Sequence, residues 1–260
     1  MPGHDDLSLI LDAAKSAGKI AARHWHNGAE SWEKPGGAGP LTEADLEVDA
    51  FLLAHLQEAR PSYGWLSEET TDNDARRGKK AVFIVDPIDG TRSFANGEKT
   101  WAISIAVVVD GAPVAGVVHM PLRDKTYTAL HGQGAFLNGQ PISAAATPRA
   151  EGGKILAARP TLSHHHWPGD LPPMARYFRS SLAYRLCLVA EGRFDAMATF
   201  RPTWEWDIAA GCLIATEAGA IVSDGQGGPI SFNRLPPQAK GTLVATPKVH
   251  SALLKLRKTA

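Results

Sequence analysis

The stretch V-D-P-I-D-G-T-R-S-F, residues 85–94, decides the fold and raises the first chemical question. The apolar run A-V-F-I-V before it predicts a buried strand, and that strand leads into two carboxylates, Asp86 and Asp89, with Gly90 and Thr91 beside them. Two unpaired charges at the end of a buried strand are strongly unfavourable unless a cation lies between them. We therefore expect a bound metal ion, with further ligands elsewhere in the chain.

The composition is that of an ordinary globular protein, with 260 residues of which 44% are hydrophobic and 21% charged. The 27 basic and 27 acidic residues balance, so we expect a small-molecule partner and neither nucleic acid nor a membrane. The two cysteines make no disulfide framework. The start of the chain lacks a signal-peptide pattern, and no apolar run has the ~18 residues of a membrane span. These features predict a cytoplasmic protein.

Periodicity along the chain predicts layers of helix and sheet. We expect amphipathic helices at residues 5–26 and after Thr42, which would cap its helix in a capping box with Asp45. Strands joined by glycine-containing turns are expected at 81–86, 101–110, 114–121, 126–130 and 134–142. After a boundary at 143–153, strands alternate with helices. The prediction is an α/β fold with an antiparallel-sheet half, residues 1–148, and a mixed half, residues 149–260.

Further acidic residues could share the expected ion: Glu68 and Glu69 in L-S-E-E-T, Asp207 in W-D-I-A-A-G, and Asp45. Oxygen ligands with no competing Cys/His cluster suit a hard cation such as Mg²⁺ or Mn²⁺. Gly90 and Thr91 open a short helical turn, whose free N–H groups favour an anion such as phosphate. Metal-binding carboxylates beside an anion site indicate hydrolysis of a phosphate ester.

Each feature taken alone also fits a structural role. The segment 86–89 could be a capped turn, Asp207 a helix N-cap, and Asp45 an acid favoured by the helix dipole. The Glu68–Glu69 pair could be a solvated charged loop. The histidines at 164–166 are typical of an exposed loop, because adjacent side chains point in different directions. The metal hypothesis rests on the combination.

Together these motifs resemble the inositol monophosphatase superfamily of metal-dependent phosphomonoesterases. Its strand motif D-P-[IL]-D-G-T is present at residues 86–91, and its helix motif W-D-x-A-A-G at residues 206–211. An acidic pair stands upstream at Glu68 and Glu69, and a T-x-x-D pair at Thr42 and Asp45. The match covers nearly the whole chain in the family order. It implies a layered αβαβα sandwich of the inositol monophosphatase and fructose-1,6-bisphosphatase type.

The resemblance also implies a mechanism with two or three ions, usually Mg²⁺ with Mn²⁺ as a substitute. By motif position, the ligands of the first ion would be Glu68, Asp86 and the backbone carbonyl of Ile88, and those of the second Asp86, Asp89 and Asp207. Asp45, with Glu68, would contribute to a third and weaker position. Most of these ligands lie in the first half of the chain. Inhibition by Li⁺ at the second position and a homodimer are further expectations from the family.

The attacking water and the phosphate have their own implied partners. Thr91 and Glu68 would orient and deprotonate the water, with Thr42 tying this network together. The N–H groups of Gly90 and Thr91 would hold the phosphate. No protein nucleophile is needed, because fixed ions place the water in line with the leaving oxygen.

Substrate specificity is expected in the second half of the chain, before Asp207. Inositol monophosphatases usually carry an acid seven residues before this aspartate, where this chain has Phe200. The stretch 200–203 instead resembles the F-G-P-T of 3′(2′),5′-bisphosphate nucleotidases, with Thr203 as its threonine. Phe200 would then offer an apolar surface to a base or ribose, and Arg185 would meet a second phosphate.

These residues favour adenosine 3′,5′-bisphosphate as the substrate. The alternative is inositol 1-phosphate or another polyol phosphate, including histidinol phosphate. A hypothesis of another class is a regulatory binding partner of the transcription or RNA machinery, a role that some superfamily members have. The retained ligand set argues against a catalytically dead scaffold.

Overall fold

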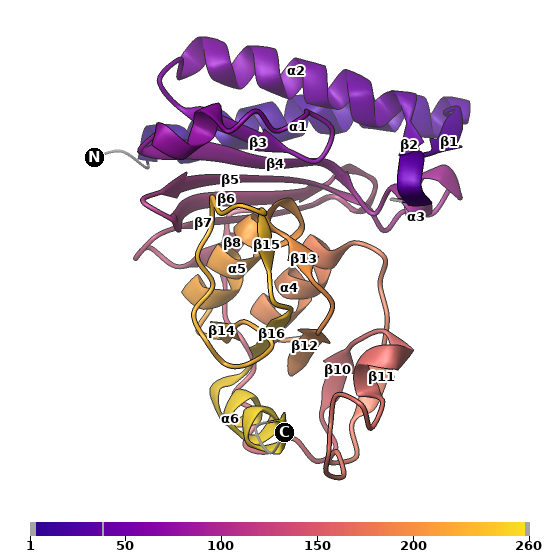
Figure 1. Cartoon of the computed structure of the whole chain (residues 1–260), viewed down its shortest axis with the longest axis vertical. Coiled ribbons are helices and arrows are strands. Elements are labelled where there is room, and N and C mark those ends of the chain that lie inside the picture. Colours follow the sequence, from indigo (N-terminus) through magenta and orange to yellow (C-terminus); the bar gives the residue numbers. More distant parts are fainter. Residues whose placement is uncertain (1–3, 38, 258–260) are drawn as a thin grey trace.

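The computed structural model describes residues 4–37 and 39–257, in which helices and sheets alternate in five layers (Figure 1). Helices α1 (His4–Asn27) and α2 (Glu43–Ala59) pack on one face of the larger sheet. Helices α4 (Leu182–Ala190) and α5 (Glu205–Glu217) cover its other face. A second sheet and helix α6 (Pro247–Arg257) complete the stack. This confirms the αβαβα sandwich expected from the sequence.

The larger sheet has seven strands in the order β3-β4-β5-β6-β7-β8-β9, so the chain adds each strand beside the previous one. Neighbouring strands are antiparallel, as expected, except for the parallel pair β3 and β4. The strands are β3 (Gly64–Ser67), β4 (Ala81–Asp89), β5 (Ala102–Val109), β6 (Ala112–Met120), β7 (Lys125–Leu130), β8 (Ala135–Leu137) and β9 (Gln140–Ile142).

The second sheet has five strands in the order β11-β10-β12-β16-β14, with β10 parallel to both neighbours. They are β10 (Lys154–Leu156), β11 (Ala175–Tyr177), β12 (Ala196–Thr199), β14 (Ile221–Ser223) and β16 (Thr242–Ala245). Two short ribbons pair β1 (Ser31–Glu33) with β2 (Pro40–Thr42), and β13 (Thr203–Trp204) with β15 (Gln238–Ala239). The remaining helices are α3 (Thr91–Ala95) and 3₁₀ turns at Pro35–Gly37, Ala75–Gly78, Pro121–Arg123 and Arg159–Leu162.

Helices α4 and α5 lie between the two sheets, which explains their unusually apolar sequences. Every residue of α4 is buried, and one hydrophobic cluster joins both helices to β4–β7 and to the second sheet. The two helices pack closely because α5 has a glycine: a Cβ at Gly211 would lie 2.5 Å from the side chain of Leu186. The division of the chain near residue 148 stays a prediction, since this cluster contains residues from both sides of it.

Local signals predicted the main elements well. Thr42 caps α2, and the reciprocal capping box with Asp45 is present. The strand predicted to end at Asp86 instead continues as β4 to Asp89, with a register shift against β5 between the two acids. In the described part of the chain, no helix combines the length and hydropathy that a membrane span requires.

Candidate metal centre

Three carboxylates from different elements meet at the carboxyl end of β4. Glu68 follows β3, which runs parallel to β4 with Ser67 opposite Val85, so Glu68 comes beside Asp86. Asp207 reaches the same place from the first turn of α5, on the opposite side of the sheet from α2. Oxygen atoms of these three carboxylates lie within 4.8 Å of one another. The structure thus brings together Glu68, Asp86 and Asp207, which the sequence predicted to share a metal site.

The charges in this cluster repel one another strongly. Burial, followed by the charges of Glu68 and Asp89, raises the pKa of Asp86 well above its usual value. Burial and the same two neighbours raise the pKa of Asp207 in the same way. Gathering carboxylates in a partly dry site is unfavourable unless a cation compensates them. A set of oxygen donors with this charge fits a hard divalent cation.

Asp89 lies next to the cluster but is bonded to helix α4. Its Oδ2 accepts hydrogen bonds from Ser181 Oγ and Ala183 N, both at 2.6 Å, and its Oδ1 accepts one from Leu182 N at 3.1 Å. Burial raises the pKa of Asp89 to about 6, although these hydrogen bonds act in the opposite direction. Asp89 thus ties β4 to the start of α4 at the edge of the acidic cluster.

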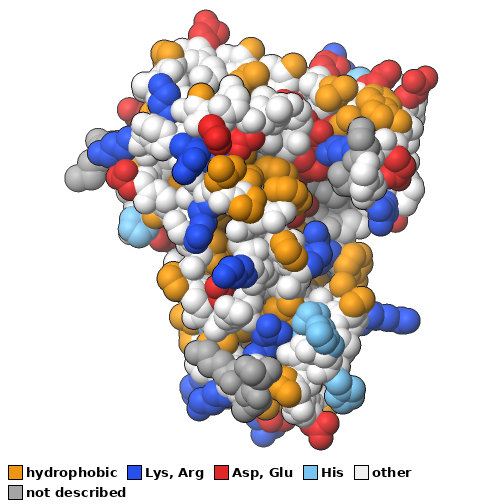
Figure 2. All heavy atoms as spheres, in the orientation of Figure 1, with side chains coloured by type: hydrophobic (Ala, Val, Ile, Leu, Met, Phe, Trp, Pro, Cys, Tyr) orange, Lys and Arg blue, Asp and Glu red, His pale blue; other side chains and the backbone are white. Residues whose placement is uncertain are grey.

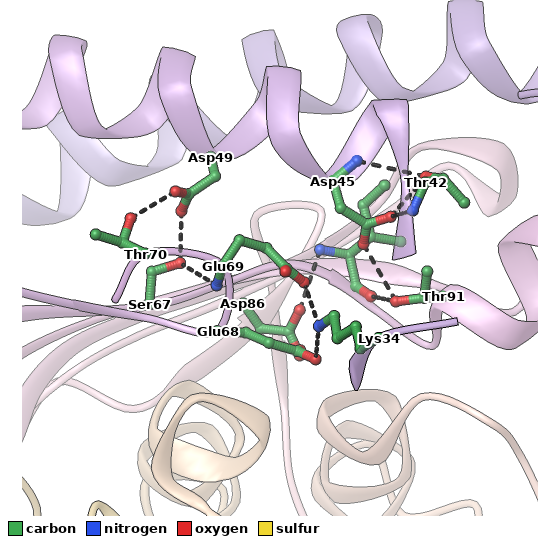
Figure 3. A network of polar contacts seen from close by, with 11 residues as sticks. Lys34, Thr42, Asp45, Asp49, Ser67, Glu68, Glu69, Thr70, Asp86 and Thr91 are labelled. Carbon is green, nitrogen blue, oxygen red and sulfur yellow. Dashed lines mark hydrogen bonds and ion pairs between the residues drawn. The ribbon is translucent and has the colours of Figure 1, made fainter. Parts of the chain in front are cut away.

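Thr42, Asp45 and Thr91 form a hydrogen-bonded group on the α2 side (Figure 3). The Asp45 carboxylate accepts from Thr42 N at 2.8 Å and from Thr42 Oγ1 at 2.5 Å. Thr91 Oγ1 lies 3.2 Å from Asp45 Oδ1 and 3.0 Å from the carbonyl oxygen of Ile88. Burial raises the pKa of Asp45 to about 6. The expected network of these residues is therefore assembled.

A lysine enters the acidic cluster from the loop between β1 and β2. Lys34 Nζ lies 2.6 Å from Glu68 Oε1 and 2.7 Å from Glu69 Oε1 (Figure 3). Sequence reasoning assigned no role to Lys34, because the contact joins residues 34 positions apart through a glycine-rich loop. The carboxyl groups raise the pKa of Lys34 against the effect of burial, so its ammonium is a tethered cation beside the site.

The acids form the floor of a cavity of about 470 Å³. Gly90 and Thr91 line it, as do three basic residues, Arg92, Arg185 and Arg201. The rings of Phe178 and Trp204 add apolar surface. Sequence reasoning singled out Arg185 but assigned no substrate role to the other two arginines or to the two rings. The cavity thus combines an acidic floor with cationic and aromatic walls.

Arg185 is held in place within this cavity. Its guanidinium lies 4.3 Å from the centre of the Phe178 ring and donates a hydrogen bond to the carbonyl of Ser180 at 3.3 Å. A second hydrogen bond goes to the carbonyl of Arg179. Burial lowers the pKa of Arg185 to about 10, so the side chain keeps its charge at neutral pH. It is a fixed positive charge facing the site.

Phe200 and Thr203, expected to contact substrate, do not line the cavity. The Phe200 ring packs against Trp167, with ring centres 5.3 Å apart, and under the guanidinium of Arg257 at 3.7 Å. The Thr203 side chain is fully buried on β13 and donates to the carbonyl of Arg201 at 3.0 Å. Of the stretch 200–203, Arg201 lines the cavity, as does Trp204, the residue that follows the stretch.

A family model described as the inositol monophosphatase family matches residues 5–260. The chain belongs to this family. It is 34% identical to the inositol-1-monophosphatase of Mesorhizobium japonicum over 85% of this chain and 86% of that protein. It is 32% identical to the Nus factor SuhB of Escherichia coli over 86% and 87%. The crystal structure of extragenic suppressor protein suhB from Bartonella henselae superposes with a TM-score of 0.86 at 29% identity, covering 98% of this chain and 99% of that one.

Membership of the inositol monophosphatase family makes the chain a metal-dependent phosphomonoesterase. This confirms the reaction class and the superfamily expected from the sequence. The finer expectation, a resemblance closest to the bisphosphate nucleotidases, is not supported, because the matched relatives are inositol monophosphatases and SuhB proteins.

Proposed function

We propose that this phosphatase hydrolyses small polyol phosphates, with inositol 1-phosphate as the reference substrate. The convergence of Glu68, Asp86 and Asp207 at the floor of a cavity carries the proposal. The named inositol monophosphatases among its relatives support polyol phosphates over the adenosine 3′,5′-bisphosphate favoured by the sequence motifs.

The acids have distinct roles in this proposal. Glu68, Asp86, the carbonyl of Ile88, Asp89 and Asp207 would hold two Mg²⁺ ions, and Asp45 would contribute to a third. When bound, the ions supply an activated water and neutralise the leaving alkoxide. To bind its ion, Asp89 would exchange a hydrogen bond from the start of α4 for a contact between a carboxylate oxygen and the ion. Mn²⁺ would replace Mg²⁺ at these positions, since it binds the same oxygen donors.

The remaining site residues would orient the attacking water and bind the phosphate. Thr91, fixed by Asp45 and by the Ile88 carbonyl, would orient the attacking water, and Glu68 would take its proton. The backbone around Gly90 would hold the phosphate. This residue has φ of +100°, and a Cβ there would lie 3.1 Å from the carbonyl oxygen of Thr100. Only glycine fits this turn without strain.

A substrate panel tests the function. Phosphate release is measured with Mg²⁺, and with EDTA as the control, on inositol 1-phosphate, glycerol 2-phosphate, histidinol phosphate and adenosine 3′,5′-bisphosphate. We expect Mg²⁺-dependent turnover that is fastest on a polyol phosphate. If no ester is hydrolysed, the proposal is contradicted and a binding role is favoured. The name of the Escherichia coli relative, Nus factor SuhB, points to a role of that kind.

A second candidate substrate class is an ester with an additional phosphate. The observation in its favour is that Arg185 and Arg201 line the same cavity as the acids. Arginine binds phosphate with two parallel hydrogen bonds, so the pair could hold a second anionic group away from the reacting one. Sensitivity to Li⁺ and a homodimer stay predictions, checked by Li⁺ titration and by sedimentation.

A further inference from the structure

A second cavity adjoins the acidic one. Glu68 and Trp204 line both, so the two spaces meet at these residues. The second cavity has a volume of about 670 Å³. Its lining combines an apolar group, Trp204, Trp206 and residues 235–237, with a polar segment at residues 70–74. Trp204 is therefore in a position to contact a group that is joined to a phosphate at the acids and extends towards this space.

Trp204 presents an open aromatic face at this junction. Its ring lies 4.7 Å from that of Trp206 at an angle of 8°, so Trp206 covers one face. Trp204 nevertheless remains 37% exposed, whereas Trp206 is 9% exposed. Figure 2 shows hydrophobic side chains gathered over the region of β13 and β15, between the upper layers and the lower half of the molecule. The stacked pair forms a flat apolar surface, with Trp204 three residues before Asp207 and Trp206 directly before it.

Several contacts hold this surface in place. β13 pairs with β15, which sets Trp204 opposite Gln238. The next residue, Glu205, is fully buried, and its carboxylate accepts hydrogen bonds from the backbone N–H groups of Asn233 at 2.6 Å and Arg234 at 2.9 Å. The loop that carries residues 235–237 is thereby fastened to the start of α5. A rigid surface loses little conformational entropy when a ligand binds to it.

The polar segment restricts what can lie on this surface. Asp72 is paired with Arg76 at 2.6 Å, while Asp74 adds a further negative charge. Thr71 and Asn73 provide groups that can form hydrogen bonds. Acids on this side disfavour a second anionic group, so the cavity suits a neutral or cationic ring with polar edges.

We propose that Trp204 is a specificity-determining residue, whose open face stacks on a flat aromatic or heteroaromatic ring in the leaving alcohol of the phosphate ester. The inference rests on the proposed function and extends its substrates beyond the polyols. Stacking of a base on an aromatic side chain is sequence-tolerant and substantial, and a saturated polyol has no comparable face. Trp204 thus favours ring-bearing monoesters over esters of the same sugar without the ring.

A matched pair of esters tests this role. Adenosine 5′-phosphate and ribose 5-phosphate share the phosphorylated ribose and differ at C1′, where adenine takes the place of a hydroxyl group. Adenosine 2′- and 3′-phosphates extend the comparison to other phosphate positions. We expect Trp204→Leu, which keeps apolar volume but removes the ring, to lower kcat/KM about tenfold for at least one adenosine phosphate. The loss on ribose 5-phosphate and inositol 1-phosphate should be severalfold smaller than the loss on that adenosine phosphate, because neither ester has an aromatic ring to stack on Trp204. Trp204→Phe should restore much of the loss.

The control variant is Ile221→Ala, which alters a hydrophobic side chain that is 43% exposed on β14 outside both cavities. Equal losses on all esters, or no loss on any adenosine phosphate, would overturn the inference. Calorimetric binding of the same pair to the wild type and to Trp204→Leu decides the question even without turnover. Failure of the phosphatase function and failure of the Trp204 role are therefore distinguishable.

Discussion

Ser67 Oγ donates a hydrogen bond to the carboxylate of Asp49 at 2.5 Å, which links helix α2 to the loop that carries Glu68. The other oxygen of Asp49 accepts from Thr70 Oγ1 at 2.6 Å (Figure 3). One buried carboxylate therefore holds both ends of the segment 67–70. Because Glu68 lies between these two anchors, its position in the acidic cluster depends on Asp49.

Replacing Asp49 should weaken metal binding more than it changes the chemistry. Hydrogen bonds to a charged group contribute roughly 1.5–3 kcal/mol each, and Asp49→Ala removes two. We expect the Mg²⁺ concentration for half-maximal activity to rise about tenfold, with kcat at saturating Mg²⁺ reduced much less. Thr70→Val, which removes one of the two bonds, is the matched control and should have a smaller effect. An unchanged Mg²⁺ dependence in Asp49→Ala would show that the loop holds its position without this carboxylate.

Asp86 is the acid shared by both proposed ion sites. Asp86→Asn keeps the shape and removes the charge, so turnover should fall by about a thousandfold or more, in line with the loss of charge stabilisation at a reacting centre. The melting temperature without metal should be maintained or raised, since a source of repulsion is removed. Phosphate release and thermal melting measure the two effects, with exposed Asp170→Asn as the control. Near-wild-type activity at saturating Mg²⁺ would refute the bridging role.

Arg185 separates the two candidate substrate classes. If it meets a second phosphate, Arg185→Ala should lower kcat/KM for adenosine 3′,5′-bisphosphate about ten- to a hundredfold, because a charge-assisted contact is lost. Inositol 1-phosphate should change little, since its single phosphate lies at the acids. Arg201→Ala is measured in parallel. Equal losses on both esters would instead assign Arg185 to positioning Asp89 and the start of α4.

Without metal, the protein should lose stability as pH rises. Burial raises the pKa of Asp45 and Asp89 to about 6 and raises the pKa of Asp86 and Asp207 well above the usual value, whereas an aspartate in an unfolded chain titrates near 3.9. From about pH 4 upwards, the folded protein therefore binds more protons than the unfolded chain. The free energy of unfolding falls as pH rises through the folded pKa values.

Thermal melting in EDTA tests this pH dependence. The melting temperature should fall between pH 5.5 and pH 7.5, and Mg²⁺ should raise it more at pH 7.5, where the acids are charged. Asp207→Asn should reduce the fall. A melting temperature in EDTA that increases over this range would contradict the proposed crowding of charge.

The sequence by itself determined the features that depend only on residues close together along the chain. The capping box of Thr42 and Asp45 needs only a spacing of three residues, and the apolar run before Asp86 predicts a buried strand wherever that strand packs. The two family motifs predict the reaction class, because in each motif the acidic residue stands at a fixed position among its neighbours in the sequence. The local patterns predicted layers of helix and sheet and a shared acidic site, and the family resemblance implied the αβαβα sandwich.

Only the tertiary structure decided which distant side chains meet. Asp89 and Ser181 are 92 residues apart, and their contact follows from how α4 packs against the end of β4. The bond from Lys34 to Glu68 depends on a loop folding over the sheet. Trp204 lines the cavity while Phe200 packs against Trp167, because the packing around each residue sets the orientation of its side chain. Orientation depends on the whole fold, so substrate specificity could not be predicted from the motif alone.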